Sequence, residues 1–128
     1  MKKKIIVTAA IFGSLAVIAG AFGAHSLQPS LSAKELEVWH IAVQYQFYHV
    51  FALLFLATLS RYKTRLVNDC YYLFTLGIVF FSGSLYLLAC RELLGWQWLR
   101  VFGPITPLGG VLFIAGWITL AFAAFKDK

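Results

Sequence analysis

Residues 5–24 read IIVTAAIFGSLAVIAGAFGA, a run without a single charged side chain. A helix needs about 20 apolar residues to cross a hydrocarbon core of about 30 Å. Lipid offers no hydrogen-bond partner to an open backbone, so a helix is the form that such a run takes in a membrane. The run therefore predicts one membrane-spanning helix.

Three more uncharged stretches follow along the chain, at residues 41–60, 70–90 and 104–125. Hydrophobic residues make up 61% of the 128 residues and charged residues only 12%, whereas roughly a quarter of the residues in soluble domains are charged. A soluble domain of this size could not bury so much apolar surface. We therefore expect one domain over residues 1–128, an all-α integral membrane four-helix bundle.

The basic residues are divided unevenly between the two ends of this bundle. The two termini and the loop between the second and third stretches carry eight Lys and Arg residues, whereas the other two loops carry only Lys34, Arg91 and Arg100. The eight are Lys2, Lys3, Lys4, Arg61, Lys63, Arg65, Lys126 and Lys128. Because cytoplasmic loops are enriched in Lys and Arg, both termini are predicted to be cytoplasmic, in a multi-pass protein of the plasma membrane.

Aromatic residues at the ends of the stretches agree with this orientation, since Trp and Tyr are enriched at membrane interfaces. The outer belt would hold Trp39, Trp96 and Trp98, and the inner belt Tyr62, Tyr71 and Tyr72. The net charge of +6 does not indicate a nucleic-acid partner, because the charges flank the apolar stretches and leave no basic helix face.

Small residues form a stripe along the first stretch. Gly13, Gly20 and Gly23 recur with Ala9 and Ala16 at spacings of three and four, which places all five on one helix face. Small residues let neighbouring helices approach closely, so we expect these glycines to serve helix packing. A cleavable secretory signal peptide is the competing interpretation, because lysines precede the run and small residues end it.

Local patterns predict how the stretches begin and end. Ser32 followed by Glu35 is a capping box, which predicts a helix from about Ala33 to Ser60. Residues 92–102 are apolar with few charges, and they form either a short interfacial helix or a tight loop. Cys70 and Cys90 lie about 30 Å apart on one helix, too far for a disulfide.

Polar residues gather in the predicted outer half of the bundle, whereas the inner half is almost purely apolar. This pattern predicts a polar pocket that opens toward the outer leaflet. Its candidate ligand-binding residues are His25, Tyr45, Gln46, His49, Ser82, Ser84, Tyr86 and Thr106.

Among these candidates, His49 has the most specific predicted role. Helical geometry places it on one face with Tyr45 and Gln46, and Tyr45 is one turn away, within hydrogen-bonding reach. An ionisable residue inside a membrane is a candidate functional residue, but a neutral imidazole also serves to join helices. His25 has a simpler role available, because a histidine at a helix end bonds the last free carbonyls.

The apolar stretches lack the groups that most catalytic chemistry requires. They contain no Asp, Glu, Lys or Arg, and the chain has no GxSxG or HExxH motif. We therefore expect no enzyme, no catalytic residues, no metal site and no cofactor. A haem held by His25 and His49 stays open as a minor alternative.

Several motifs together resemble a known family. They are Gly20-Ala21-Phe22-Gly23-Ala24-His25, Tyr45-Gln46 with His49, Phe81-Ser82-Gly83-Ser84-Leu85-Tyr86, and Gly103-Pro104-Ile105-Thr106-Pro107-Leu108-Gly109-Gly110 with Gly116-Trp117. Their order over nearly the whole chain resembles the YgdD/YwdK-like family. The resemblance implies a small four-helix integral membrane protein with relatives in bacteria and animal cells, and here a bacterial inner membrane, but no established activity.

The sequence thus predicts a non-enzymatic membrane protein. Its pocket would bind a small amphipathic ligand or a partner helix, and its partners would be the bilayer and a homo-oligomer or another membrane protein. Two alternatives stay open: a permeation module for a small neutral solute, and a haem- or redox-associated membrane subunit.

Overall fold

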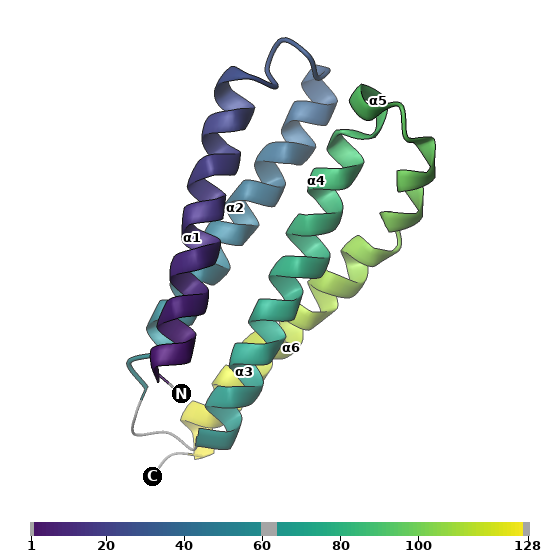
Figure 1. Cartoon of the computed structure of the whole chain (residues 1–128). Helices are drawn as coiled ribbons and strands as arrows, with labels where there is room; N and C mark the ends of the chain where they lie inside the picture. Colours follow the sequence, from purple (N-terminus) through teal and green to yellow (C-terminus); the bar gives the residue numbers. More distant parts are fainter. Residues whose placement is uncertain (1, 60–63, 127–128) are drawn as a thin grey trace.

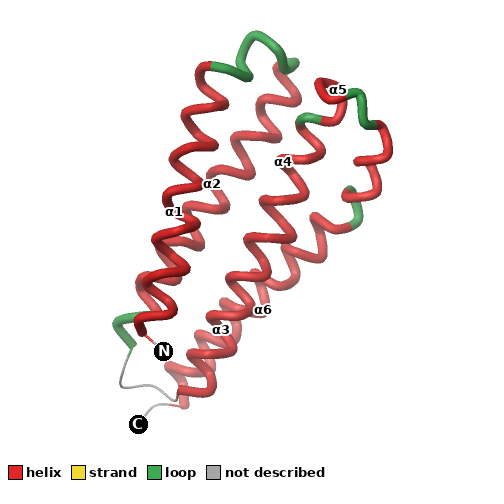
Figure 2. Tube along the Cα trace, viewed as in Figure 1, coloured by secondary structure: helices red, strands yellow, loops and turns green. Residues whose placement is uncertain are grey.

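The computed structural model describes residues 2–59 and 64–126, and within these ranges every regular element is helical. Figures 1 and 2 show long helices lying side by side. The elements are α1 (Lys2–His25), α2 (Ala33–Leu56), α3 (Thr64–Gly77), the π-helical turn η1 (Ile78–Ser82), α4 (Gly83–Ala89), α5 (Arg91–Leu94), the 3₁₀ turn η2 (Gln97–Phe102) and α6 (Ile105–Lys126). The all-α prediction is confirmed.

Within the described residues, three segments are long and apolar enough to cross a membrane: Lys2–His25, Arg65–Ala89 and Gln97–Lys126. α2 is not among them, although the sequence predicts a span at residues 41–60. The reason lies in its composition, since two histidines and two glutamines lower its hydropathy. Of these four, Gln46 and His49 are buried against other helices.

The helices are arranged as two pairs. α1 packs against α2, α3 packs against α6, and α2 joins the two pairs through its contacts with α3, η1 and α4. α1 begins and α6 ends at the same end of the molecule (Figure 1). The predicted inner-loop residues Arg61, Tyr62 and Lys63, and Lys128 of the tail, lie outside the described residues.

The ends of α2 show why it begins and stops where it does. Glu35 donates its backbone N–H to the Ser32 hydroxyl at 3.1 Å, and the Ser32 N–H donates to the Glu35 carboxylate at 2.9 Å, so the capping box is confirmed. The helix stops at Leu56, before the predicted end at Ser60. The Thr58 hydroxyl bonds the Phe55 carbonyl at 2.7 Å and so satisfies one of the acceptors that the helix end leaves free.

The segment between α4 and α6 is neither a single helix nor an irregular loop. It forms two short helical pieces, α5 and η2, separated at Gly95, whose φ of 70° is left-handed and suits glycine. Trp96 and Trp98 are exposed there, as an interfacial segment requires, whereas Leu99 is buried. Tyr71, which was predicted to lie in the inner aromatic belt, is not exposed in this way. It is buried, and its hydroxyl bonds that of Thr8 at 2.7 Å.

The core lies between the two helix pairs, on the side of the chain ends. Its largest fully buried side chains include Ile5, Leu53, Leu56 and Phe74. Cys70 is also buried there, and both cysteines are free, as their spacing predicted.

Glycines make the close approach of α6 to α3 and η1 possible. A Cβ at Gly77 would collide with the Phe113 ring, and one at Gly116 would lie 2.6 Å from the Phe74 ring. A Cβ at Gly109 would collide with the backbone of Phe81. Because these three glycines lack side chains, aromatic rings and a neighbouring backbone occupy the space.

Candidate functional site

The structure brings most of the predicted pocket residues together, but as a packed set of helix-joining contacts. Gln46, His49, Ser82 and Ser84 are all buried. Each of these four side chains makes at least one hydrogen bond to a backbone carbonyl, and some also bond a side chain on another helix. We refer to these contacts as the polar seam, made of Gln46, His49, Ser82, Ser84, Tyr86, Thr106 and Trp117.

His49 uses both ring nitrogens within the seam. Its Nδ1–H donates to the backbone carbonyl of Tyr45 at 2.8 Å, and its Nε2 accepts the indole N–H of Trp117 at 3.1 Å. One nitrogen donates and the other accepts, so this arrangement holds a neutral imidazole. The ring also stacks on Phe113, with centroids 3.5 Å apart and planes 8° from parallel. His49 therefore joins α2 to α6.

Gln46 connects three helices. Its amide N–H donates to the carbonyl of Phe12 on α1 at 2.7 Å, and its side-chain oxygen accepts the hydroxyl of Tyr86 on α4 at 2.7 Å. The Tyr86 ring packs on the Trp39 ring, with centroids 4.6 Å apart. The Trp39 indole N–H in turn bonds the carbonyl of Ala19 on α1 at 2.8 Å. These contacts tie α1, α2 and α4 together.

The two serines join η1 and α4 to their neighbours. The Ser82 hydroxyl donates to the carbonyl of Ala42 on α2 at 2.7 Å. The Ser84 hydroxyl donates to the Phe81 carbonyl at 2.9 Å, so its oxygen accepts from the hydroxyl of Thr106 on α6. Hydrogen bonds of this kind are common between membrane helices.

Two predicted pocket residues lie outside the seam. His25 is exposed at the end of α1. Tyr45 is 38% exposed, and its ring packs on Phe81. Its backbone carbonyl, and not its hydroxyl, accepts the hydrogen bond from the His49 ring. Within residues 2–59 and 64–126, no three His, Cys, Asp or Glu side chains are grouped closely enough to hold a metal ion.

Trp39 and Trp117 were missed as site residues by the sequence analysis. Trp39 was assigned only to the outer interfacial belt, and Trp117 appeared only within a family motif. Both donate indole hydrogen bonds across helices, at partly buried positions. The signal available was their chemistry, because an indole N–H near lipid needs an acceptor.

The three glycines of the α1 stripe lie toward α2. A Cβ at Gly13 would lie 3.5 Å from Val50 and one at Gly20 would lie 3.7 Å from Val43, both ordinary contacts. At Gly23 it would lie 2.7 Å from the Trp39 ring. Gly23 therefore makes the space that Trp39 occupies.

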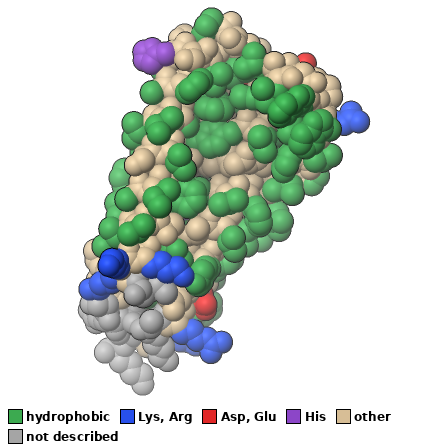
Figure 3. Space-filling view, in the orientation of Figure 1, with side chains coloured by type: hydrophobic (Ala, Val, Ile, Leu, Met, Phe, Trp, Pro, Cys, Tyr) green, Lys and Arg blue, Asp and Glu red, His purple; other side chains and the backbone are tan. Residues whose placement is uncertain are grey.

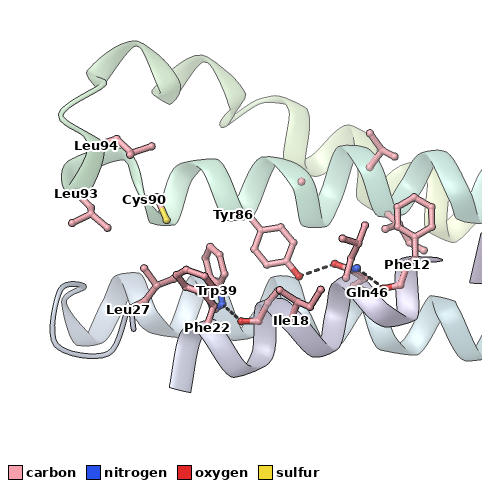
Figure 4. A pocket seen from close by; sticks show the side chains of 15 residues that line it. Phe12, Ile18, Phe22, Leu27, Trp39, Gln46, Tyr86, Cys90, Leu93 and Leu94 are labelled. Carbon is pink, nitrogen blue, oxygen red and sulfur yellow. Dashed lines mark hydrogen bonds between the residues drawn. The ribbon is translucent and has the colours of Figure 1, made fainter. Parts of the chain in front are cut away.

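A groove of about 640 Å³ runs between α1 on one side and η1, α4 and α5 on the other. We call it the lateral groove. On α1, its wall is made by Phe12, Leu15, Ile18, Ala19 and Phe22. Figure 4 shows Leu27, Cys90, Leu93 and Leu94 at one end, and the hydrogen-bonded Gln46 and Tyr86 farther along.

The lateral groove differs from the predicted polar pocket. Of the eight predicted residues, Gln46 and Tyr86 line it. Their polar atoms already bond each other or a backbone carbonyl, and so does the Trp39 indole. The remaining lining is overwhelmingly apolar, so the groove presents hydrocarbon surface to whatever enters it.

The outer surface has the character of a protein in lipid. Large hydrophobic side chains are exposed along α1 and α6, among them Val17, Ile18, Val111 and Ile114. Figure 3 shows hydrophobic side chains across the middle of the visible face, with most of its Lys and Arg near the end where α1 begins. An all-helical chain with such a surface is a multi-pass integral membrane protein.

The comparisons place the chain within this class. Residues 19–110 match the family described as "Protein of unknown function (DUF423)". The chain is 47% identical to a UPF0382 membrane protein of Staphylococcus saprophyticus, and the match covers 97% of this chain and 98% of the relative. It is 43% identical to the UPF0382 membrane protein YwdK of Bacillus subtilis, with the same two shares. No solved structure matches the chain significantly.

The chain therefore belongs to the DUF423 family of membrane proteins, which confirms the resemblance seen in its motifs. The named relatives are bacterial membrane proteins, in agreement with the predicted plasma-membrane location.

Proposed function

We propose that this protein is a non-enzymatic membrane protein with four crossing helices and cytoplasmic termini, and that its lateral groove holds the hydrocarbon chain of an amphipathic ligand. The observation that carries the proposal is the groove of about 640 Å³, whose polar atoms are already hydrogen-bonded. Its volume is in the range typical of small-molecule sites.

The order of the helices supports a fourth crossing by α2. α1 and the α3–η1–α4 rod are both apolar enough to span and run in the same direction (Figure 1). α2 connects the far end of α1 to the near end of α3, so it has to return across the same layer. Its 24 residues extend about 36 Å, enough for this return.

The lining of the lateral groove favours a flexible chain over a partner helix. Helices in membranes pack closely through small residues, and α1 directs its glycine stripe toward α2. Toward the groove, α1 presents Phe12, Leu15, Ile18 and Phe22. These bulky side chains suit a hydrocarbon chain, which adapts its shape to them.

The groove is also continuous with the lipid-facing surface. Leu15, Ile18 and Phe22 line it, and each of these side chains is about half exposed. A chain can therefore enter sideways from the bilayer. The polar seam does not favour the permeation alternative, because its buried groups are bonded to one another or to the backbone.

Photolabelling tests the proposal. The protein, reconstituted in phosphatidylcholine vesicles, is labelled with palmitic acid that carries a mid-chain diazirine, and the adducts are mapped by peptide mass spectrometry. We expect adducts to concentrate on residues 12–22 and 78–94. Adducts on the exposed α6 face, at Val111, Ile114 and Ile118, in proportion to exposure would mean ordinary lipid contact and would overturn the proposal.

A further inference from the structure

Gly83 lies in the wall of the lateral groove and has no structural reason to be glycine. It sits at the junction of η1 and α4 with φ −58° and ψ −46°, ordinary right-handed helical angles. A Cβ built there would meet nothing within 4 Å. An alanine therefore fits this backbone and this space.

Gly13, Gly20 and Gly110 resemble Gly83 in that an added Cβ would make only ordinary contacts, but of these four glycines Gly83 alone lines the lateral groove. Three other helical glycines differ from Gly83. Gly77, Gly109 and Gly116 lie so close to neighbouring rings or backbone that a Cβ would have to displace them. Glycine within a helix costs about 1 kcal/mol relative to alanine. At these three positions the close packing offsets that cost, whereas at Gly83 no contact within the described protein does so.

The position of Gly83 in the groove supplies a reason for glycine at this site. Gly83 lines the wall opposite α1, one turn before Tyr86, whose ring packs on Trp39. Trp39 bonds the carbonyl of Ala19, the smallest residue that α1 places in the groove. A side chain at position 83 would enter the space between these walls.

We propose that Gly83 is a ligand-contact residue, at which the hydrocarbon chain lies directly against the helix backbone. This inference rests on the proposed function and adds the residue that keeps the groove open. The occupant is the uncharged hydrocarbon part of a membrane amphiphile, because the groove walls carry no charged side chain and are continuous with the lipid-facing surface.

Substitutions at position 83 test the inference with the same diazirine-labelled palmitic acid. Gly83→Leu fills the groove, and we expect labelling of residues 12–22 to fall about tenfold, roughly the effect of losing two buried methylene contacts. Gly83→Ala is expected to cause a smaller loss. Gly110→Ala is the matched control, because its Cβ would lie 3.9 Å from Phe81 and outside the groove.

The outcomes separate the two proposals. Groove labelling in the natural protein that persists unchanged in Gly83→Leu would overturn the role of Gly83 and leave the groove function standing. Scattered labelling in the natural protein would overturn both. Thermal unfolding shows whether the variants still fold. Gly83→Ala and Gly110→Ala are each expected to unfold at or above the unfolding temperature of the natural protein. Reduced labelling in a destabilised Gly83→Ala would count against the inference.

Discussion

The imidazole of His49 is held on all sides by protein. The backbone carbonyl of Tyr45 accepts the hydrogen bond of its Nδ1–H, Trp117 donates to its other nitrogen, and Phe113 covers one face. A histidine that bound a ligand or metal would need one nitrogen free. The contacts instead favour the interpretation that His49 joins helices.

We expect His49→Ala to lower the free energy of unfolding by about 2–4 kcal/mol, because it leaves a cavity and an unpaired Trp117 N–H. Groove labelling should be unchanged, since His49 does not line the groove. The measurement is thermal or denaturant unfolding in detergent micelles, with the exposed His25→Ala as control. An equally stable His49→Ala protein that loses a bound ligand would reverse the assignment.

At the residue scale, the sequence could predict which polar residues meet but not what they form. Helical periodicity and the orientation of the helices placed Gln46, His49 and the two serines at one end. Their partners are largely backbone carbonyls, of Phe12, Tyr45 and Ala42, and a carbonyl has no signature in a sequence. For that reason a pocket and a packed seam look the same before the structure is seen.

Among the elements, α6 and the α3–η1–α4 rod interlock most closely. The rod passes through a π-helical turn at Ile78–Ser82, and Gly109 of α6 lies against the backbone of that turn. Phe113 and Phe74 fill the spaces left by Gly77 and Gly116. This interface sets the position of the wall that carries Gly83.

We predict that Gly109→Ala destabilises the protein by about 1–3 kcal/mol, because the added methyl group meets backbone that cannot rotate away. Gly110→Ala, one residue along the same helix, should instead be neutral or stabilising by up to about 1 kcal/mol. Unfolding of both variants in the same detergent gives the comparison. Equal stability of the two would contradict the packing described here.

Helix locations were largely predictable at the element scale, because apolar length and charge spacing determine them. The capping box also placed the start of α2 correctly. The end of α2 was not predictable from composition, since the uncharged run continues past Leu56 to Ser60. The π-helical turn likewise has no sequence pattern of its own.

For the whole molecule, the helix order gives a definite topology. The loop at residues 26–32 and the C-terminal end of α6 lie at opposite ends of the molecule (Figure 1). The uneven distribution of Lys and Arg predicts that the chain ends are cytoplasmic.

We expect Ser30→Cys to react with a membrane-impermeant maleimide in intact cells, and Lys126→Cys to react only after lysis. The natural protein supplies the baseline, because Cys70 is buried and Cys90 lies in the apolar groove. Labelling of Lys126→Cys in intact cells would place the C-terminus outside and refute the proposed orientation.

The lateral groove is the feature of the whole molecule that could not be predicted from the sequence. Its walls are residues of ordinary lipid-facing character, such as Leu15, Ile18 and Leu93, which no pattern separates from other exposed apolar residues. The groove exists because α1 packs on α2 while the contacts of α4 are with α2 and its own neighbours.

A crystal structure grown from a lipidic mesophase would show most directly whether the lateral groove holds a hydrocarbon chain. We expect continuous, elongated density between α1 and α4 that passes against Gly83 and beside the Trp39 ring. A groove closed by direct packing of the Phe12–Phe22 face of α1 onto α4, or filled by a helix of a neighbouring protein, would contradict it.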